Sequence, residues 1–239
     1  MNDSVTTGQP ANDAAQDAGP APAAAAQQEA RPPRDRKRGP RAGDVQPTLE
    51  KLAALHPQLF GAVFRPLKRG IFQDLLAAHP DAFEKEALKD ALAFHTRSTR
   101  YLTAVAAGQQ RHDLQGQAVE AMAPEHVHHA LLEVFRRRQA RSAEDLRPKL
   151  RDRIVQAVEA SGLSGEDYAQ LVRGRDEAAN ALLDEALAVA AERRAKDEAL
   201  RRAFEASGAS VEAFAAMYGL DPRAAARSLE RAQRASPAA

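Results

Sequence analysis

The 239-residue chain contains no cysteine and no tryptophan, and only 5% of its residues are aromatic. Without cysteine, the chain cannot form a disulfide scaffold, a thiolate zinc site, an iron–sulfur cluster or a cysteine nucleophile. No stretch approaches the roughly 20 consecutive apolar residues that span a bilayer, and the N-terminus lacks the basic-then-apolar order of a signal peptide. These absences predict a soluble, cytoplasmic protein with no membrane partner.

The chain also lacks an excess of charge of one sign, since 34 Lys and Arg residues face 33 Asp and Glu residues. Proteins that bind nucleic acids usually carry a strong basic excess. Counted by region, the net charge is 0 over residues 1–48, +2 over 49–139 and −1 over 140–239. A nucleic-acid site would therefore depend on a few cations placed on one face.

Residues 1–47 are predicted to form a disordered arm rich in alanine and proline. Residues 1–48 hold seven of the fourteen prolines and contain no Leu, Ile, Phe, Tyr or Trp, so they have almost nothing to bury in exchange for the entropy of ordering. A basic patch at 31–41 includes Arg34, Arg36, Lys37 and Arg38. This patch is either an auxiliary nucleic-acid-binding arm or a solvated linker.

Residues 48–139 are predicted to form a compact, mainly α-helical domain with a small β-hairpin, because Leu and Phe recur there at helical spacing. Six of the eight Phe residues lie in this region and are expected to be buried. Helices are expected from a Thr48 cap to Leu55, over 70–78, after an Asp81–Glu84 capping box, from Thr96 or Ser98 to near Gly108, and from Pro124. The hairpin is expected over 111–119 around a Gln-Gly turn.

Residues 140–239 are predicted to be an all-α extension with a two-copy helical repeat. The segment Ala157–Gly162 recurs as Ala203–Gly208, and the 46-residue offset continues to Tyr168 and Phe214. Each copy has the order helix end, Gly stop, Ser cap, short helix, second Gly (Gly174 or Gly219) and Asp cap. Two copies indicate paired helical hairpins rather than a solenoid, which needs about three repeats.

Cations cluster between residues 65 and 111, where eight Lys and Arg face five Asp and Glu. Arg65, Lys68 and Arg69 precede a predicted helix N-terminus, a place that favours an anion such as phosphate, although a carboxylate partner is the alternative. Lys85 and Lys89 share a helix face. Three further cations and one aromatic follow: Arg97, Arg100, Tyr101 and Arg111.

These segments together resemble the ProQ/FinO family of bacterial RNA chaperones over residues 48–139. The resemblance rests on Arg-Pro-Leu-Lys-Arg-Gly-Ile-Phe-Gln-Asp-Leu at 65–75, Leu-Lys-Asp-Ala-Leu at 88–92, the segment 96–102, and Gly-Gln-Gln-Arg-His-Asp-Leu-Gln-Gly at 108–116. The resemblance depends on the order and spacing of these four segments taken together. The arm and the repeat lie outside it.

The resemblance implies a non-enzymatic RNA-binding protein without a cofactor, whose concave basic face binds stem-loops with single-stranded 3′ ends. Its partners would be small RNAs, mRNA 3′ ends and terminator hairpins, which it would anneal or stabilise in post-transcriptional regulation. By the same resemblance, Arg65 and Lys68 contact the RNA backbone near the duplex, and Lys85 and Lys89 extend the face. Arg69 and Arg97 are further candidate RNA-binding residues. Arg100, Tyr101 and Arg111 line or support the 3′-end site. Arg34, Arg36, Lys37 and Arg38 would add nonspecific attraction to phosphates.

The sequence departs from the family pattern at three positions. Ala93 stands where a basic residue is common, His95 where Tyr is common, and Thr99 where a large side chain occurs. Arg97 is expected to replace part of the lost charge.

Two other kinds of site are not supported by the residues. His126, His128 and His129 lie on a predicted helix but lack a His-Glu-x-x-His pattern, so we expect this helix to pack on the core with some imidazoles exposed and no metal. No phosphate-binding glycine loop or nucleophile elbow is present, and Asp113 is expected to shape a turn rather than to act in catalysis.

Two alternatives stay open at this point. The repeat in residues 140–239 superficially resembles a helix-turn-helix, which would make the protein a DNA-binding regulator. The second alternative is that the protein is a structural helical adaptor whose extension docks another protein. Residues 176–206 are in addition a candidate segment for self-association.

Overall fold

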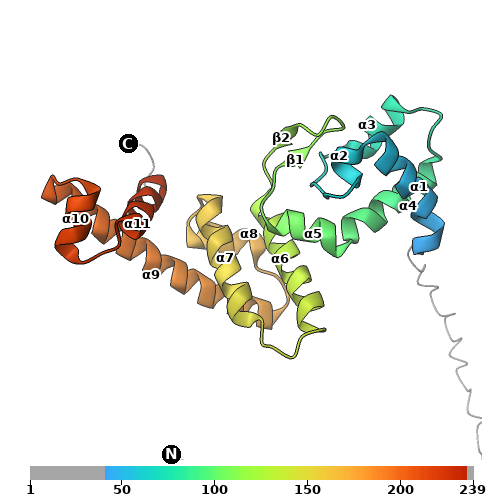
Figure 1. Cartoon of the computed structure of the whole chain (residues 1–239). Helices are drawn as coiled ribbons and strands as arrows, with labels where there is room; N and C mark the ends of the chain where they lie inside the picture. Colours follow the sequence, from blue (N-terminus) through green and yellow to red (C-terminus); the bar gives the residue numbers. More distant parts are fainter. Residues whose placement is uncertain (1–40, 236–239) are drawn as a thin grey trace, which may run out of the picture. The chain divides into compact units, whose positions relative to one another are not determined.

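The computed structural model describes residues 41–235, in which eleven helices and one two-stranded antiparallel sheet are found (Figure 1). The prediction of a mainly α-helical chain with a small β-hairpin is confirmed. The elements are α1 (Ala42–Leu55), α2 (Pro57–Phe60), α3 (Ile71–Ala78), α4 (Lys85–Arg97), α5 (Thr99–Ala106), β1 (Arg111–His112), β2 (Ala118–Glu120), α6 (Pro124–Gln139), α7 (Arg147–Ser161), α8 (Gly165–Val172), α9 (Glu177–Ser207), α10 (Val211–Tyr218) and α11 (Pro222–Ala235).

Two predicted helix starts were wrong. α1 begins at Ala42 rather than after Thr48, so residues 42–47, assigned above to the arm, are helical. Val45 explains the earlier start, because its side chain is only 2% exposed and gives the first turn an apolar contact. α4 is capped by Glu84 itself, whose carboxylate accepts hydrogen bonds from the backbone N–H groups of Glu86 and Ala87, and not by Asp81.

Other local signals gave the correct structure. Ser98 rather than Thr96 caps α5, since its hydroxyl accepts a hydrogen bond from the Tyr101 N–H. β1 pairs with β2, and Asp113 shapes the turn by accepting hydrogen bonds from the N–H groups of Gln115 and Gln117. Gly116 has a φ of +75° in this turn, a conformation that favours glycine.

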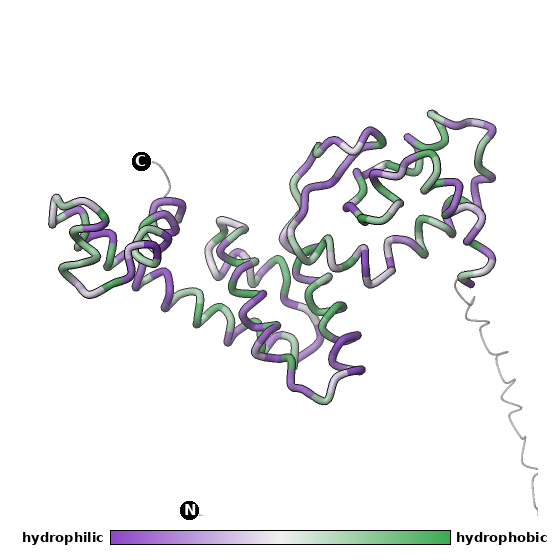
Figure 2. Tube along the Cα trace, in the orientation of Figure 1, coloured by the Kyte–Doolittle hydropathy of each residue, from purple (hydrophilic) through white to green (hydrophobic). Residues whose placement is uncertain are grey.

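The core is formed where the amphipathic helices turn their apolar faces inward, and hydrophobic and hydrophilic residues alternate along the tube in Figure 2. α1 packs against α4, and α5 packs against α6. Phe60 and Phe83 are buried as expected, but Phe94 is 37% exposed and is not a core residue.

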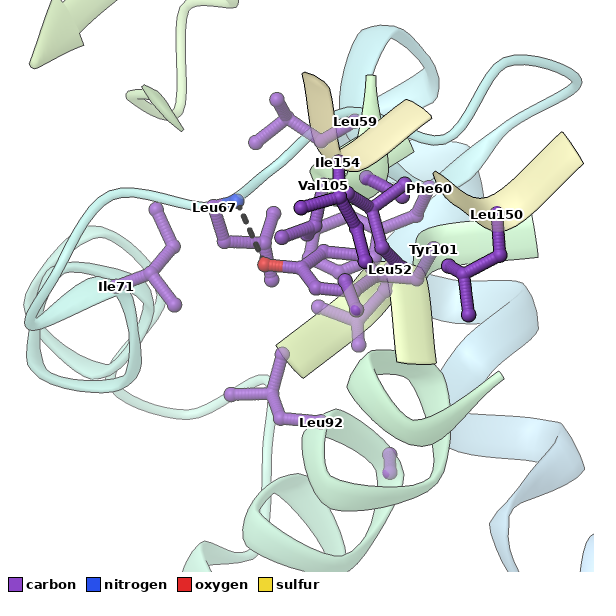
Figure 3. Packing of buried hydrophobic residues seen from close by; sticks show 14 of the residues in the cluster. Leu52, Leu59, Phe60, Leu67, Ile71, Leu92, Tyr101, Val105, Leu150 and Ile154 are labelled. Carbon is purple, nitrogen blue, oxygen red and sulfur yellow. Dashed lines mark hydrogen bonds between the residues drawn. The ribbon is translucent and has the colours of Figure 1, made fainter. Parts of the chain in front are cut away.

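The first half of the extension shares this core. Leu150 and Ile154 of α7 belong to the same buried cluster as Leu52, Tyr101 and Val105 (Figure 3). α7 and α8 both pack against α6, and α7 also packs against α9. The packing therefore continues across residue 139.

The two copies of the repeat have the predicted order of elements. Gly162 and Gly208 end helices in the left-handed conformation, and the hydroxyls of Ser164 and Ser210 cap the short helices α8 and α10. One detail differs: Gly174 has no positive φ, and α8 ends at Arg173 in an extended conformation.

The histidines of α6 are divided as expected. His128 is buried and its ring lies 5.9 Å from that of Tyr168, while His126 and His129 are exposed. Burial lowers the pKa of His128 to about 4. Within residues 41–235, no helix is long and apolar enough to cross a membrane.

Candidate nucleic-acid interface

The loop of residues 61–70, which joins α2 to α3, positions the first group of predicted cations. Its middle part runs beside the hairpin: the Lys68 N–H donates to the carbonyl of His112, and the His112 N–H donates to the carbonyl of Pro66, both at 2.8 Å. Pro66 and Leu67 are buried. The loop backbone is therefore held in place as a short parallel partner of β1.

Tyr101 and Arg111 both bind the peptide groups of Leu67. The Leu67 N–H donates to the Tyr101 Oη at 3.1 Å, a bond drawn as a dashed line in Figure 3. Arg111 Nη1 donates to the Leu67 carbonyl at 3.0 Å. Tyr101 is only 6% exposed, and this burial raises the pKa of its phenol. Tyr101 thus supports the loop from inside, while the half-buried Arg111 holds it from its edge.

Arg65 and Arg100 are also held by backbone carbonyls. Arg65 Nη1 donates to the Gly116 carbonyl at 3.1 Å, and Arg100 Nη2 donates to the Ala62 carbonyl at 3.0 Å. The Arg100 guanidinium also lies over the ring of Phe64, 4.8 Å from its centroid, in a cation–π contact. Neither arginine forms an ion pair with a carboxylate among the described residues, so no neighbouring negative charge offsets either guanidinium.

Lys68 and Arg69, in contrast, have carboxylate partners. Lys68 Nζ lies 2.8 Å from Asp74 Oδ2, and this hydrogen bond raises the pKa of Lys68. Arg69 lies 2.8 Å from Glu120, whose pKa is lowered by a hydrogen bond from the Arg69 backbone N–H. From the sequence, a carboxylate partner was the alternative to a bound phosphate for these cations. The sequence did not identify Asp74 and Glu120 as the partners.

The lysines of α4 form a separate group. Lys85 is the first residue of α4, is exposed and has no partner within the described part of the chain. Lys89, one turn later, pairs with Glu86 at 3.2 Å. Arg97 ends the same helix, and its carbonyl accepts a hydrogen bond from Arg137. No hydrogen bond or ion pair joins these three cations to the loop in residues 41–235.

An aromatic cluster under the loop was missed by the sequence analysis. The His95 ring lies 4.4 Å from that of Phe64 and 5.4 Å from that of Tyr101. Phe60 contacts the same imidazole edge-on at 4.9 Å. His95 is 3% exposed, and burial lowers its pKa to about 4. These rings connect Arg100, through Phe64, to Tyr101; the run of aromatic residues at 60, 64 and 101 was the available signal.

The cations of the extension differ from those around the loop, because ten of them form ion pairs with carboxylates. Paired charges largely cancel at a distance and attract phosphate weakly. The ten are Arg147, Lys149, Arg151, Arg173, Arg193, Lys196, Arg201, Arg202, Arg231 and Arg234.

Residues 42–147 match the model of the ProQ/FINO family. This part of the chain belongs to the ProQ/FinO family. A curated relative, the RNA chaperone ProQ of Idiomarina loihiensis, is 43% identical over 82 residues. These residues are 34% of this chain and 39% of that relative, so the chain spans about two fifths of the relative's length.

A solved structure, that of a FinO-like RNA chaperone of Neisseria meningitidis, is 30% identical in sequence to this chain. The match covers 38% of this chain and 93% of that one, with a TM-score of 0.34.

Within the ProQ/FinO domain, the three departures from the family pattern occupy different environments. His95 lies in the aromatic cluster described above, and Ala93 is half-buried on α4. Thr99 accepts a hydrogen bond from Arg137 at 3.1 Å and so joins α5 to α6. Arg34, Arg36, Lys37 and Arg38 lie outside the described residues.

Proposed function

We propose that this protein binds structured RNA through the surface formed by Arg65, Arg100 and Arg111 around the loop of residues 61–70. The observation that carries the proposal is the way these arginines are held: each donates to a backbone carbonyl, at Gly116, Ala62 and Leu67 respectively, which fixes it without neutralising it. Arg65 and Arg100 form no ion pair among the described residues, whereas Arg111 lies opposite Glu120 in the hairpin and its charge helps to lower the pKa of that carboxyl. Guanidinium groups fixed in this way suit phosphate oxygens.

The fit is to RNA rather than to a sequence-specific duplex DNA site. Side chains cannot read the deep major groove of A-form RNA, so proteins recognise it by shape, phosphates and 2′-hydroxyls, with specificity at unpaired ends. The described surface offers cations on a rigid frame and a buried tyrosine that supports it, and no helix of cations placed for a major groove. The curated relative above is an RNA chaperone, which supports the same class of ligand.

The ligand we propose is a stem-loop with a single-stranded 3′ tail, as found in terminator hairpins, small RNAs and mRNA 3′ ends. The duplex would lie against Arg65 and Lys68, with Lys85 and Lys89 extending the contact along α4 and Arg69 and Arg97 at its edges. Arg100, Tyr101 and Arg111 would shape the 3′-end site. Binding would anneal or stabilise the RNA in the cytoplasm, without a chemical step or a cofactor, in post-transcriptional regulation.

The test is filter binding of a hairpin with and without its 3′ tail. We expect Lys68→Ala, Lys89→Ala and Arg111→Ala to weaken binding of the tailed hairpin. Lys149→Ala is the control, because Lys149 also pairs with a carboxylate, at 2.8 Å, but lies in the extension. The site assignment fails if the three site variants bind like the wild type, and the 3′-end preference fails if removal of the tail changes nothing.

The alternative of a DNA-binding regulator is tested by the same assay with duplex DNA. Arg223 and Arg227 of α11 are exposed and have no carboxylate partner within residues 41–235. If the repeat binds DNA, the double variant Arg223→Ala/Arg227→Ala loses duplex binding. The proposal made here expects weak duplex DNA binding and unchanged hairpin binding in that variant.

A further inference from the structure

The first helix of the extension is part of the core of the ProQ/FinO domain. Leu150 and Ile154 of α7 are 4% and 0% exposed and lie in the same buried cluster as Tyr101 and Val105 of α5 (Figure 3). α7 also packs against α6, which in turn packs against α5. Because such a core is close-packed, the exposed side chains of α7 are held in fixed positions relative to α5.

Arg153 of α7 reaches the C-terminal end of α5. Its Nη2 donates to the carbonyl of Ala106 at 3.0 Å. Ala106 is the last residue of α5, and the carbonyls of the last turn of a helix have no partner within the helix. The carbonyls just before that of Ala106 accept hydrogen bonds from the N–H groups of Ala107 and Gly108. Arg153 supplies a donor for the next carbonyl from a different helix.

Arg153 differs in its charge balance from Arg137, which binds the other end of α5. Arg137 of α6 donates to the carbonyl of Arg97 and to the hydroxyl of Thr99, but Glu133 lies 3.9 Å from its guanidinium. Arg153 is exposed and forms no ion pair within residues 41–235. It therefore combines a fixed position with a charge that no carboxylate offsets.

The charge of Arg153 changes how the end of α5 acts on an anion. A helix C-terminus carries partial negative charge on its carbonyls and repels phosphate. A guanidinium bound to the carbonyl of Ala106 offsets that charge. It also keeps N–H groups for a second acceptor, because a guanidinium has five N–H donors. The C-terminal end of α5 is thereby made suitable for a phosphate oxygen.

This end of α5 is also close along the chain to the proposed 3′-end site. Arg111, which belongs to that site, follows Ala106 by five residues. The Cα atoms of Ala106 and Arg111 are therefore at most about 18 Å apart. About five nucleotides of a stacked strand, at roughly 3.4 Å each, cover that distance.

We propose that Arg153 binds a backbone phosphate of the single-stranded 3′ tail. The tail fits better than the duplex, because the cations proposed for the duplex lie on the loop of residues 61–70 and on α4. α4 adjoins the N-terminal end of α5, whereas Arg153 lies at the C-terminal end. The family match ends at residue 147, so this contact is a contribution of the extension. The inference rests on the RNA binding proposed above.

Salt-dependent binding of hairpins with and without a 3′ tail tests this role in the full chain. Arg153→Gln keeps a side-chain N–H donor for the carbonyl of Ala106 but removes the charge. We expect it to bind the tailed hairpin about fivefold more weakly at low salt and the hairpin without a tail like the wild type. The slope of log K against log salt for the tailed hairpin should fall in magnitude by about 0.7, the value for one phosphate of a single strand.

Two further variants separate this contact from a structural role. Arg153→Lys keeps both a donor and the charge, and we expect it to retain most of the affinity for the tailed hairpin. Arg147→Gln removes the same charge from α7, but Arg147 is paired with Asp145 at 2.7 Å, so both hairpins should bind as in the wild type. Urea unfolding should show similar stability for all of these proteins.

The proposal is overturned if Arg153→Gln binds the tailed hairpin like the wild type, or if it weakens binding of both hairpins equally. The triple variant Arg65→Ala/Arg100→Ala/Arg111→Ala, measured alongside, distinguishes this failure from that of the proposed function. A loss of affinity in the triple variant without a loss in Arg153→Gln overturns the role of Arg153 alone. No loss in either variant overturns both.

Discussion

The Tyr101 hydroxyl accepts a hydrogen bond from the Leu67 N–H at 3.1 Å, and the carbonyl of Leu67 accepts one from Arg111 Nη1 at 3.0 Å. Leu67 is 3% exposed, so water does not replace these partners. The position of the loop that carries Arg65, Lys68 and Arg69 therefore depends on α5 and β1.

The first prediction concerns the Tyr101 hydroxyl. Tyr101→Phe keeps the ring but leaves the buried Leu67 N–H without its acceptor, which costs about 1–3 kcal/mol. We expect urea unfolding to show a loss of stability in this range, and the affinity for the tailed hairpin to fall with it. Tyr218→Phe is the control, since the Tyr218 side chain is 56% exposed. Equal stability of Tyr101→Phe and wild type would contradict the role of the hydrogen bond.

The second prediction is a gain of affinity. The Asp74 carboxylate partly offsets the charge of Lys68, since Asp74 Oδ2 lies 2.8 Å from Lys68 Nζ. Asp74→Asn should therefore leave the Lys68 charge free to attract phosphate and strengthen hairpin binding several-fold at low salt. Glu192→Gln removes the same charge from an ion pair of α9 and should change binding little. If Asp74→Asn binds more weakly than the wild type, Lys68 needs its carboxylate partner for correct placement, and the electrostatic account of this residue is wrong.

The third prediction is a dependence on salt. Each phosphate neutralised on a duplex contributes about −0.9 to the slope of log K against log salt. We expect Arg65→Ala and Arg100→Ala each to reduce the magnitude of the slope by about 1. Arg202→Ala should leave it unchanged, because Arg202 is paired with Glu198 in the extension. Parallel slopes for all four proteins would show that the loop arginines do not contact phosphate.

The fourth prediction is a dependence of stability on pH. Burial lowers the pKa of His95 to about 4, while the unfolded chain titrates near its ordinary value of 6.5. The unfolded state therefore takes up the proton first as the pH falls, and stability is lost between pH 6.5 and pH 4. Between pH 8 and pH 5, we expect the free energy of unfolding of His95→Phe to fall by about 2 kcal/mol less than that of the wild type.

Phe is a fair replacement for His95, because the Nε2 atom of His95 has no hydrogen-bond partner in the structure and three aromatic rings surround the imidazole. His128 also has a pKa of about 4, but both proteins retain it, so its contribution cancels. Urea unfolding at several pH values measures the difference. Curves that stay parallel from pH 8 to pH 5 would contradict a buried neutral His95.

Local chemistry explains which parts of the fold the sequence predicted. Ser98, Ser164, Ser210 and the turn residue Asp113 act through hydrogen bonds from N–H groups two to four residues away, so a short window of sequence contains their cause. The helix over 42–47 was missed because its early start depends on the burial of Val45, which is a tertiary contact. The packing of α7 and α8 on α6 is tertiary in the same way.

The candidate site shows the same difference between local and tertiary causes. Sequence spacing identified the cations but not their partners, because Lys68 meets Asp74 six residues away while Arg69 meets Glu120 fifty-one residues away. The distinction between arginines held by carbonyls and cations paired with carboxylates exists only after folding. By that distinction, Arg65, Arg100 and Arg111 are stronger candidates for RNA binding than Lys68, Arg69 and Lys89.

One measurement tests RNA binding at this loop most directly: equilibrium binding of a tailed terminator hairpin to two triple variants of the full chain, Arg65→Ala/Arg100→Ala/Arg111→Ala and Arg175→Ala/Arg223→Ala/Arg227→Ala. Both remove three arginines that form no ion pair within residues 41–235, although Glu120 lies opposite Arg111 in the hairpin. We predict that the loop variant loses affinity about 100-fold, equivalent to about 2.8 kcal/mol, while the control stays within about twofold of the wild type. Equal losses in the two variants, or a larger loss in the control, would contradict the account.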